Sequence, residues 1–324
     1  MRAIVCRELG PPEQLRLETS APVPLGQGQV RVVIRAAGIN FPDILMAAGE
    51  YQLKPGLPFT PGMEAAGDVT EVGGEVGGFA VGDRVIVKMR HGAYADEVVV
   101  APAQLTPLPS NFDHAEGATF LAAHGTAHHA LVDRGQLRSG ETLLVHGAGG
   151  GVGLAAVEIG KLLGASVIAA ASREEKLAVA RARGADHLVL YAREPFRDAV
   201  KRITDGRGAD VVFDPVGGEV FENSLRCIAW GARLLVIGFT GGIGLARTNL
   251  VLIKGASVLG VRAGEAARQN PALGERRMTE LLQWAERGKV RPYVSHRLPL
   301  EDCAKAMRLL IERKAIGRVA LMMG

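Results

Sequence analysis

Cysteine and aromatic side chains are scarce in this sequence. Only three cysteines occur among 324 residues, at Cys6, Cys227 and Cys303. An odd and widely spaced set is typical of small buried side chains, and it excludes a disulfide framework. Aromatic residues make up 5% of the chain. This is too few for the stacking platforms on which proteins bind single-stranded nucleic acid.

Long apolar runs and blocks of like charge are also missing. No uncharged apolar stretch approaches the roughly 18 residues that a membrane-spanning helix needs. Charged residues flank the only apolar run at the N-terminus, residues 3–5, so we expect no signal peptide and a cytoplasmic protein. The formal net charge is +4, but acidic and basic residues alternate. A nucleic-acid partner is therefore not expected.

Apolar residues and glycine are plentiful. Hydrophobic residues make up 48% of the chain, which also contains 42 glycines. This much apolar surface offsets the entropy lost on folding and excludes intrinsic disorder. The glycines follow no fixed period, which excludes a collagen-like chain. The length is sufficient for two domains of ordinary size.

The pattern of the sequence changes near residue 111. Before it, short strand-like runs at 30–36, 84–87 and 94–100 alternate with Gly- and Pro-rich turns, which is typical of a small barrel-like domain. After it, Asp113 and Glu116 have the spacing of a helix capping box. Helical and apolar strand patterns then alternate, which predicts an α/β domain with a parallel sheet covered on both faces. The predicted strands are residues 143–146, 166–170, 187–190, 210–213, 233–237 and 318–321, and the predicted helices are 152–163, 173–183, 276–286 and 298–313.

A glycine-rich segment lies between one of these strands and the helix that follows. It reads His146-Gly147-Ala148-Gly149-Gly150-Gly151-Val152-Gly153. Glycines at this place let backbone amides approach a pyrophosphate and let the helix pack closely on the strand. The N-terminus of the helix adds unpaired N–H groups and partial positive charge. The segment therefore predicts a dinucleotide site, and the alternative is a flexible turn without a ligand.

The end of the next strand indicates which dinucleotide is bound. NAD-binding folds place an Asp or Glu about 20 residues beyond the glycines, where it accepts hydrogen bonds from the ribose. Here that position is Ala171, followed by Ser172, Arg173 and Lys176. A hydroxyl and two cations suit the 2′-phosphate of NADPH. The alternative is that Ser172 begins a capping box and that the two cations are solvated helix charges.

Six further segments complete a pattern that resembles a known family. They are residues 37–43, 58–67, 82–85, 125–127, 214–218 and 317–319. In this order and at these spacings they resemble the medium-chain dehydrogenase/reductases, in the zinc-free quinone oxidoreductase branch that includes zeta-crystallin. The resemblance implies a discontinuous GroES-like catalytic domain, residues 1–120 and 264–324, and a Rossmann NADP-binding domain, residues 121–263.

The resemblance also implies that this chain holds no metal. Zinc-containing relatives carry ligands where this chain has Asn40, Met63 and Ala122. Amide, thioether and methyl side chains do not replace the thiolate and imidazole ligands of a catalytic zinc. His124 and His128 are four residues apart, but no third ligand is near them in the sequence, so packing or polar roles are expected for both.

Individual site residues follow from the same resemblance. It implies that Asn40 lies beside the nicotinamide and hydrogen-bonds the substrate or the cofactor, although an Asn turn before Pro42 is the alternative. Tyr51 is a candidate proton donor, with packing on Leu53 as its alternative. The expected cofactor contacts are Asn40, Thr126, Gly147, Gly149, Gly150, Gly151, Val152, Gly153, Ser172, Arg173, Lys176, Tyr191, Val216, Gly238, Phe239 and Arg318.

The function that these features favour is an NADPH:quinone oxidoreductase. Without a metal, the chemistry falls to the cofactor, whose hydride reduces quinones or similar conjugated carbonyls. The first alternative is a 2-alkenal or enoyl-thioester reductase, which would need a basic entrance for a carrier phosphate. Arg247, Arg262 and Arg268 were considered for it, but their positions are not fixed by the sequence. A more distant alternative is a non-catalytic NADPH- or RNA-binding protein.

Oligomeric state is implied only by the resemblance. Family members form homodimers, and the apolar run 250–261 is the segment expected to extend the Rossmann sheet into a second copy. The alternative is that this run forms an internal buried strand.

Overall fold

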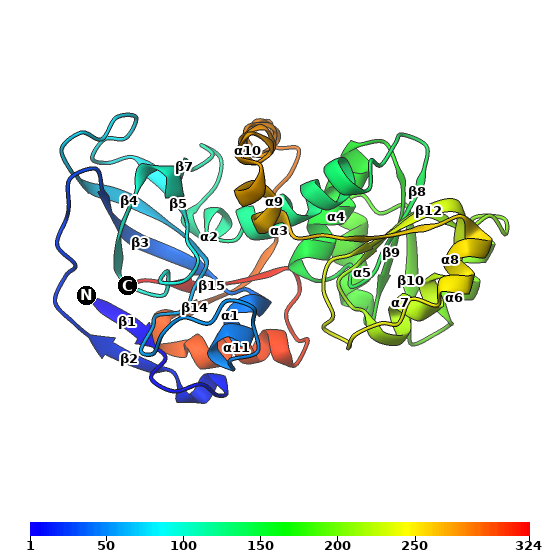
Figure 1. Cartoon of the computed structure of the whole chain (residues 1–324), viewed down its shortest axis with the longest axis horizontal. Helices are drawn as coiled ribbons and strands as arrows, with labels where there is room; N and C mark the ends of the chain where they lie inside the picture. Colours follow the sequence, from blue (N-terminus) through cyan, green and yellow to red (C-terminus); the bar gives the residue numbers. More distant parts are fainter. The chain divides into compact units, whose positions relative to one another are not determined.

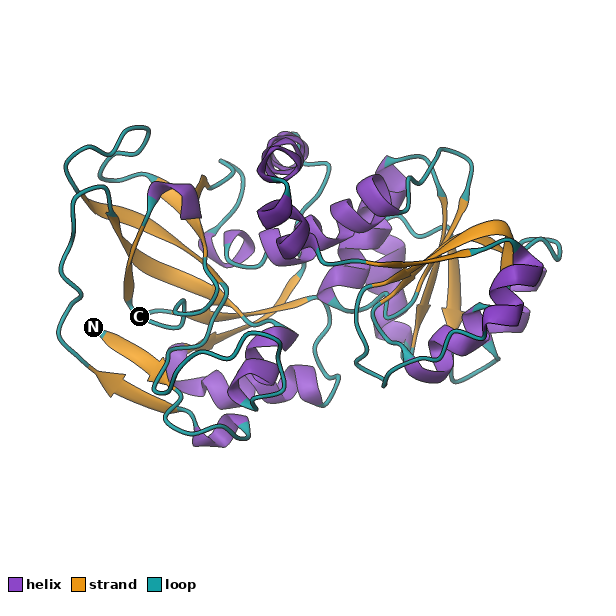
Figure 2. Cartoon of the chain, viewed as in Figure 1, coloured by secondary structure: helices purple, strands orange, loops and turns teal.

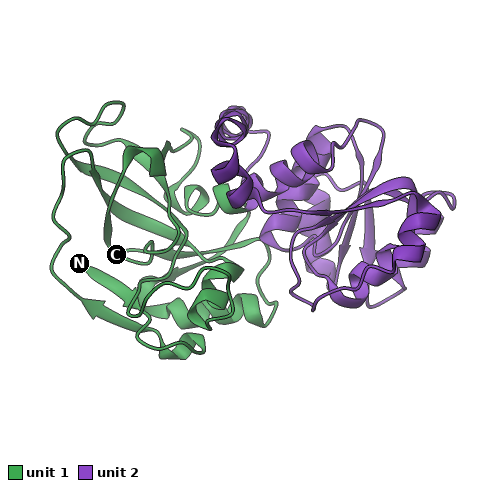
Figure 3. Ribbon diagram, in the orientation of Figure 1, with its two compact units in different colours: residues 1–122, 292–324 green, residues 123–291 purple.

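The computed structural model describes all residues, 1–324, as two compact units. Unit 1 consists of residues 1–122 and 292–324, and unit 2 consists of residues 123–291 (Figure 3). The domain boundaries predicted from the sequence, at 120 and 263, place residues 264–291 with the first domain. By compactness these residues belong to unit 2.

Unit 1 is built on a seven-stranded sheet and a separate two-stranded sheet (Figures 1 and 2). The larger sheet has the order β14-β15-β3-β4-β5-β7, and β6 also pairs with β3. Its central strands are antiparallel, and its last strand β15 closes against β3. The strands are β1 (Arg2–Val5), β2 (Arg16–Thr19), β3 (Val30–Gly38), β4 (Glu64–Val72), β5 (Arg84–Lys88), β6 (Glu97–Val100), β7 (Leu105–Pro107), β14 (Val294–Pro299) and β15 (Arg318–Met322).

Short helices close the hydrophobic core of unit 1. The predicted capping box is confirmed at the start of α2: the Asp113 carboxylate accepts from the Glu116 amide, and the Glu116 carboxylate accepts from the Asp113 amide, both at 2.9 Å. The helices and 3₁₀ turns of this unit are η1 (Pro12–Gln14), α1 (Phe41–Ala47), η2 (Pro102–Gln104), α2 (His114–Gly117), η4 (Leu300–Asp302) and α11 (Cys303–Ile311).

Unit 2 contains one sheet of six parallel strands in the order β10-β9-β8-β11-β12-β13. Its central strands are fully buried because helices cover both faces (Figure 2), so their sequences are continuous apolar runs rather than alternating ones. The strands are β8 (Thr142–Val145), β9 (Ser166–Ala171), β10 (His187–Leu190), β11 (Ala209–Asp214), β12 (Ile228–Val236) and β13 (Ser257–Gly260).

The connections of this sheet fix where a ligand binds. The chain runs outward from β8 in one direction and from β11 in the other, which is the doubly wound order of dinucleotide-binding folds. In such folds a ligand binds in the crevice at the carboxyl ends of the strands where the order reverses, which here are β8 and β11. The helical segments are α3 (Leu121–His128), η3 (His129–Arg134), α4 (Gly151–Leu162), α5 (Glu174–Ala182), α6 (Phe196–Ile203), α7 (Gly218–Ser224), α8 (Thr248–Lys254), α9 (Ala263–Gln269) and α10 (Pro271–Glu286).

Several predicted elements differ from the structure. The helix predicted over residues 276–286 begins earlier, at Pro271 in α10, and the strand predicted over 94–100 begins later, at Glu97 in β6. The helix predicted over residues 298–313 is wrong at its start, since Leu298 lies in β14 and α11 begins at Cys303. Pro299 explains the shift, because a proline disfavours helical backbone at the residue before it. The apolar run 250–261 is not one internal strand, because it forms the end of α8 and the edge strand β13. No helix combines the length and apolar character needed to cross a membrane.

Candidate functional site

The glycine-rich segment forms a tight turn from β8 into α4. Gly147 has a φ of +56°, which favours glycine, and Gly150 is the N-cap of the helix. A Cβ at Gly153 would lie 2.3 Å from the carbonyl oxygen of Gly147, so only glycine fits there. Because Gly150 has no side chain to cap the helix, the amides of its first turn are left for another acceptor.

Lys176 lies against this turn. It is 8% exposed, and a Cβ at Gly149 would approach the Lys176 side-chain carbons to 2.5–2.7 Å. Ser172 and Arg173 are exposed at the end of β9, and α5 begins one residue later, with Arg173 as its N-cap. Ser172 is therefore not the N-cap, and the capping box that was its alternative role does not form there. The structure brings Lys176 to the glycine turn and places Ser172 and Arg173 at the adjoining strand end.

The loop after β11 lies beside the glycine turn. The Cβ position of Gly147 lies 3.3 Å from Pro215 and 3.5 Å from Val216. This loop is anchored by the buried carboxylate of Asp214, which accepts from the amides of Val216 at 2.8 Å and Gly217 at 3.0 Å. Burial raises the pKa of Asp214, although the two amides oppose that shift.

A second loop, after β12, contacts the loop that follows β11. The amide of Gly241 donates to the Val216 carbonyl at 2.7 Å, and a Cβ at Gly238 would lie 3.3 Å from the Pro215 carbonyl oxygen. Phe239 is 52% exposed next to these residues. The structure therefore brings together Val216, Gly238 and Phe239. Thr126 lies half-buried on α3, and no contact with these three residues defines its role.

Tyr191 lies directly after β10 and faces the end of β8. Its hydroxyl is 2.8 Å from Nδ1 of His146, the residue before the glycine turn. Burial raises the pKa of this phenol. Tyr191 thus belongs to the same edge of the sheet as the glycine turn.

These features of unit 2 fit a dinucleotide. The turn has glycine wherever a Cβ would collide with backbone or with Lys176, and the first-turn amides of a twelve-residue helix point outward from it. Residues 147–153 would hold the pyrophosphate, and the end of β9 would hold the adenosine ribose. The loops after β11 and β12 would border the other half of the molecule.

Unit 1 contains a separate buried polar cluster around Asn40. The Arg318 guanidinium donates to Asn40 Oδ1 at 2.9 Å and also to a Glu64 carboxylate oxygen. Asn40 Nδ2 donates to the same Glu64 oxygen at 3.3 Å. The second Glu64 oxygen accepts from the Ala122 amide at 2.8 Å. This arrangement fixes which end of the Asn40 amide faces which partner, with its oxygen on the cation and its nitrogen on the carboxylate.

Asp43 holds the backbone of Asn40 from the other side. Its Oδ2 accepts from the Asn40 amide at 2.9 Å and from the Tyr94 hydroxyl at 2.8 Å, while Oδ1 is buried without a partner. Burial raises the Asp43 pKa from 3.8 to about 7. Burial likewise raises the pKa of Glu64, and Arg318 opposes that shift.

Tyr51 lies apart from this cluster. Its side chain is half-buried with Leu53 against Cys6, Met46 and Phe59. Tyr51 and Leu53 thus pack against the same buried cluster. The assignment of Tyr51 as a proton donor stays a prediction, as do the cofactor contacts expected of Asn40 and Arg318.

The two histidines considered for a metal face different carboxylates. His124 Nε2 is 3.0 Å from Glu158, and His128 Nε2 is 2.7 Å from Glu280. No group of three or more His, Cys, Asp or Glu side chains in the structure is arranged to hold a metal ion.

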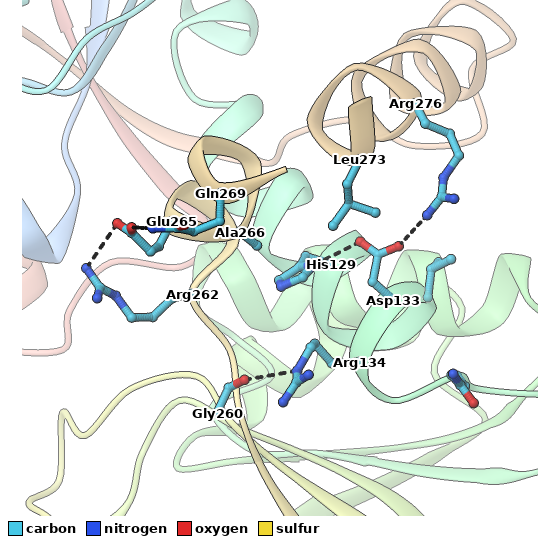
Figure 4. Close-up of a pocket in the computed structure, with 12 residues that line it drawn as sticks. His129, Asp133, Arg134, Gly260, Arg262, Glu265, Ala266, Gln269, Leu273 and Arg276 are labelled. Carbon is cyan, nitrogen blue, oxygen red and sulfur yellow. Dashed lines mark hydrogen bonds and ion pairs between the residues drawn. The ribbon is translucent and has the colours of Figure 1, made fainter. Parts of the chain in front are cut away.

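A cavity of about 770 Å³ lies between η3 and the α9–α10 pair (Figure 4). It contains several arginines, but each has a partner. Arg276 pairs with Asp133 at 2.9 Å, and Arg134 donates to the Gly260 carbonyl at 3.2 Å. Arg262 lies 3.9 Å from Glu265. Asp133 and Glu265 thus offset part of the positive charge of this cavity, because the partner of Arg134 is a carbonyl.

Sequence reasoning assigned no role to Glu64, Asp43 or His146. One local signal was present for Asp43, since an acidic residue three positions after Asn40 matches a helix start. For His146 the signal was a polar residue at the end of an otherwise apolar buried strand. Glu64 has no local signal, because its partners are 24 and 254 residues away in the sequence.

We predict that Asp43→Asn makes the free energy of unfolding less dependent on pH. Asp43 keeps its proton in the folded state up to about pH 7 and loses it near pH 3.8 when unfolded, so it destabilises the fold as pH rises between these values. The wild type should lose on the order of 4 kcal/mol relative to the variant across this window. Urea unfolding at pH 4 to 8 measures it, and parallel curves for the two proteins would refute the assignment.

Comparison with known proteins places these features in a family. Residues 26–110 match the family model described as an alcohol dehydrogenase GroES-like domain, and residues 151–286 match the one described as a zinc-binding dehydrogenase. The chain is 38% identical over 324 residues to a quinone oxidoreductase-like protein 2 homolog of Nematostella vectensis, covering 99% of this chain and 88% of that protein. It is 32% identical to a quinone oxidoreductase of Rattus norvegicus, covering 100% and 98%.

Solved structures agree with these relatives. An NAD-dependent alcohol dehydrogenase superposes with a TM-score of 0.92 at 35% identity, covering both chains fully. The Escherichia coli quinone oxidoreductase complexed with NADPH superposes with a TM-score of 0.91 at 27% identity, covering 99% of this chain and 100% of that one. The JamJ enoyl reductase gives 0.87 at 28% identity, covering 100% and 99%. With a GroES-like unit, a Rossmann unit and relatives along its whole length, this chain belongs to the quinone oxidoreductase branch of the medium-chain dehydrogenase/reductase family.

Proposed function

We propose that this protein is an NADPH:quinone oxidoreductase that reduces quinones or similar conjugated carbonyls. The observation that carries the proposal is the glycine-rich turn of unit 2, which lies against Lys176, together with the end of β9, where no carboxylate stands. NADPH supplies the hydride when it is bound. The relatives named for quinone reduction support the choice of substrate class.

Residues of unit 2 bind and orient the cofactor in this proposal. The backbone of Gly147, Gly149, Gly150, Gly151, Val152 and Gly153 surrounds the pyrophosphate, because N–H groups at a helix start attract anions. Tyr191 packs near the adenosine end. Val216, Gly238 and Phe239 border the nicotinamide half, and Thr126 is proposed to contact it from α3.

The preference for NADPH rests on the end of β9. Ser172 and Arg173 are exposed there, and the buried Lys176 side chain, from the first turn of α5, lies against Gly149 of the glycine turn. A 2′-phosphate would be attracted by the positive charge of Arg173 and Lys176, whereas the ribose of NADH would find no carboxylate acceptor at the end of β9. The NADPH complex of the Escherichia coli relative supports this preference, and the NAD-dependent structural relative is the reason to test it directly.

Unit 1 supplies the groups that hold the substrate. Arg318 donates to Asn40 Oδ1, and Glu64 accepts from Asn40 Nδ2, so the Asn40 amide is held in one orientation. Asn40 Nδ2 also donates to the Gly38 carbonyl at 3.4 Å, and we propose that it exchanges this long bond for one to the substrate carbonyl oxygen, which it then positions for hydride transfer. Arg318 is proposed to contact the cofactor as well, and Tyr51 is the candidate proton donor. Met63 and Ala122 offer no metal ligand, so we propose that no metal takes part.

Reduction of 2-alkenals or enoyl thioesters is the second candidate. The JamJ enoyl reductase supports it. A carrier phosphate would need an unneutralised cation, but Arg262 and Arg268 lie near Glu265, and Arg247 lies 3.8 Å from Glu222. These pairings reduce the positive charge available to a carrier phosphate, although Arg262 and Arg268 share the single carboxylate of Glu265. Binding of NADPH or RNA without catalysis is the remaining alternative.

A panel of acceptors tests the function. We expect NADPH oxidation with 9,10-phenanthrenequinone or 1,4-benzoquinone at a kcat/KM at least tenfold above that with crotonyl-CoA. Gly153→Ala should reduce the rate with every acceptor, because its Cβ displaces the turn. Gly264→Ala is the control and should have no effect, since only the flexible Arg268 side chain comes near its Cβ. A preference for crotonyl-CoA would favour enoyl reduction, and no oxidation with any acceptor would favour binding alone.

Replacing Ser172, Arg173 and Lys176 together by alanine tests the choice of cofactor. We expect the Kd for NADPH to rise roughly 10- to 100-fold, as for the loss of charge-assisted phosphate contacts, and the Kd for NADH to change less than about threefold. Fluorescence titration measures both constants. Arg181→Ala, an exposed cation in the last turn of the same helix, is the matched control. Equal weakening of the two dinucleotides would contradict a 2′-phosphate site.

We also propose that the protein is a homodimer formed through unit 2. The strand β13 pairs only with β12, so its other edge is unpaired. Trp230 and Leu252 are each 78% exposed and Ile253 is 63% exposed, and the Trp230 indole lies against Gly255 in the turn before β13. A second copy placed on a two-fold axis would pair the two edges antiparallel and cover these side chains.

The dimer is tested by light scattering. The wild type should have twice the 34.2 kDa chain mass, and Leu252→Glu with Ile253→Glu should give the monomer mass because burying two carboxylates opposes association. Val81→Glu, at an apolar residue of unit 1 that is 68% exposed, is the control and should stay dimeric. A wild type that is monomeric at micromolar concentration would rule out the interface.

A further inference from the structure

His146 is a fully buried imidazole whose two ring nitrogens both have partners. It follows β8 and immediately precedes the glycine turn. Nδ1 lies 2.8 Å from the Tyr191 hydroxyl, and Nε2 lies 2.8 Å from the Ser224 hydroxyl. The two hydroxyls come from opposite sides of the sheet order, because Tyr191 follows β10 and Ser224 ends α7, which follows β11. No cofactor contact was expected of His146 or Ser224.

The direction of each hydrogen bond can be worked out from Ser224. Its single hydroxyl proton goes to the Val220 carbonyl at 2.7 Å. The Ser224 oxygen must therefore accept from His146, which places the proton of the imidazole on Nε2. Nδ1 then carries a lone pair and accepts from the Tyr191 hydroxyl. The phenol oxygen in turn hydrogen-bonds the backbone of Gly147, whose N–H lowers the phenol pKa against the effect of burial.

This chain of donors requires an uncharged imidazole. A protonated Nδ1 would compete with the Gly147 amide for the Tyr191 oxygen and would leave the phenol proton without an acceptor. Burial lowers the His146 pKa to about 3. Phe196 packs edge-on against the imidazole, with ring centroids 4.7 Å apart, and contacts Tyr191 as well. The aromatic packing excludes water that would otherwise replace either partner.

The hydrogen-bonded chain joins the two loops that border the crevice. At one end it holds the amide of Gly147, the residue whose φ of +56° begins the glycine turn. At the other end it holds α7, whose N-cap Gly217 and first residue Gly218 both have positive φ. The Asp214 carboxylate fixes the same loop through the amides of Val216 and Gly217. One imidazole thus connects the pyrophosphate turn with the loop assigned to the nicotinamide half.

We propose that His146 is a positioning residue, which holds the glycine turn and the loop after β11 in one arrangement through Tyr191 and Ser224, so that the dinucleotide meets a preformed crevice. The proposal rests on the proposed function for the identity of the ligand. It assigns Ser224 a part in cofactor affinity, although Ser224 lies on α7 and is not among the expected cofactor contacts. Preorganisation of this kind affects affinity rather than the chemical step.

The test removes each hydroxyl separately. Tyr191→Phe keeps the ring and Ser224→Ala keeps the helix, and each should raise the Kd for NADPH about 3- to 10-fold, as expected for one lost hydrogen bond. For Ser224→Ala, whose side chain is not among the expected cofactor contacts, the KM for the quinone and kcat at saturating NADPH should stay within twofold. The double variant should be less than additive, because either change interrupts the same chain. In ¹⁵N NMR of the wild type, His146 should be the neutral tautomer with its proton on Nε2 between pH 5.5 and 8.

A matched control separates positioning from general stability. Thr204→Val removes a hydroxyl that donates to the Val200 carbonyl and accepts from the Gly208 amide, both at 2.8 Å, at the end of α6. It should lower the unfolding temperature as the test variants do and leave the Kd for NADPH unchanged. If Tyr191→Phe and Ser224→Ala also leave the Kd unchanged, or if His146 carries its proton on Nδ1, the proposal is wrong.

One readout does not depend on the cofactor. In the protein without ligand, both variants should increase hydrogen–deuterium exchange in peptides that contain residues 146–154 and 215–221, and Thr204→Val should not. If the wild type binds no NADPH, the proposed function fails, and hydrogen–deuterium exchange alone decides whether His146 holds the two loops. Unchanged exchange in both variants would overturn the positioning role.

Discussion

The close approach of α4 to the turn that precedes it is the constraint on which unit 2 depends. At Gly153 the helix passes so near the Gly147 carbonyl that no side chain fits between them. The helix can therefore start directly beneath the carboxyl end of β8, with a bare N-cap at Gly150. Everything assigned to the cofactor follows from that start: the direction of the first amides, the place of Lys176 above Gly149, and the contact of Gly147 with the loop after β11.

Unit 1 depends on a different principle, which is the pairing of charges inside a core. Glu64 and Arg318 are both almost fully buried and face each other, and Asn40 completes the set. Removing one partner from such a pair leaves an uncompensated charge, which is strongly destabilising. The side chains that hold the Asn40 amide, Glu64 and Arg318, therefore cannot be substituted singly without destabilising unit 1. Asp43 adds a backbone contact to Asn40.

Local patterns were sufficient to predict most of the fold. The strands of unit 2 were predicted to within a residue or two at most ends, because buried parallel strands have continuous apolar sequences between turn residues. The glycine turn and the Asp113 capping box were equally local. Two kinds of feature were not predicted correctly. Pro299 precedes α11, which begins at Cys303 rather than at Leu298. No residue near Glu64 in the sequence indicates that its partner is Arg318. The ring nitrogens of His146 likewise find their partners 45 and 78 residues further along the chain.

The strand β15 comes from the last residues of the chain, yet it pairs with β3 near the beginning and supplies Arg318 to Glu64 and Asn40. During synthesis residues 123–291 are made before that strand, so unit 2 can begin to fold while unit 1 still lacks one edge of its sheet. In the interval Glu64 has no guanidinium to face, and the open side of β3 is exposed to other chains. Completion of unit 1 is therefore a late event in the life of each molecule, set by translation rather than by local propensity.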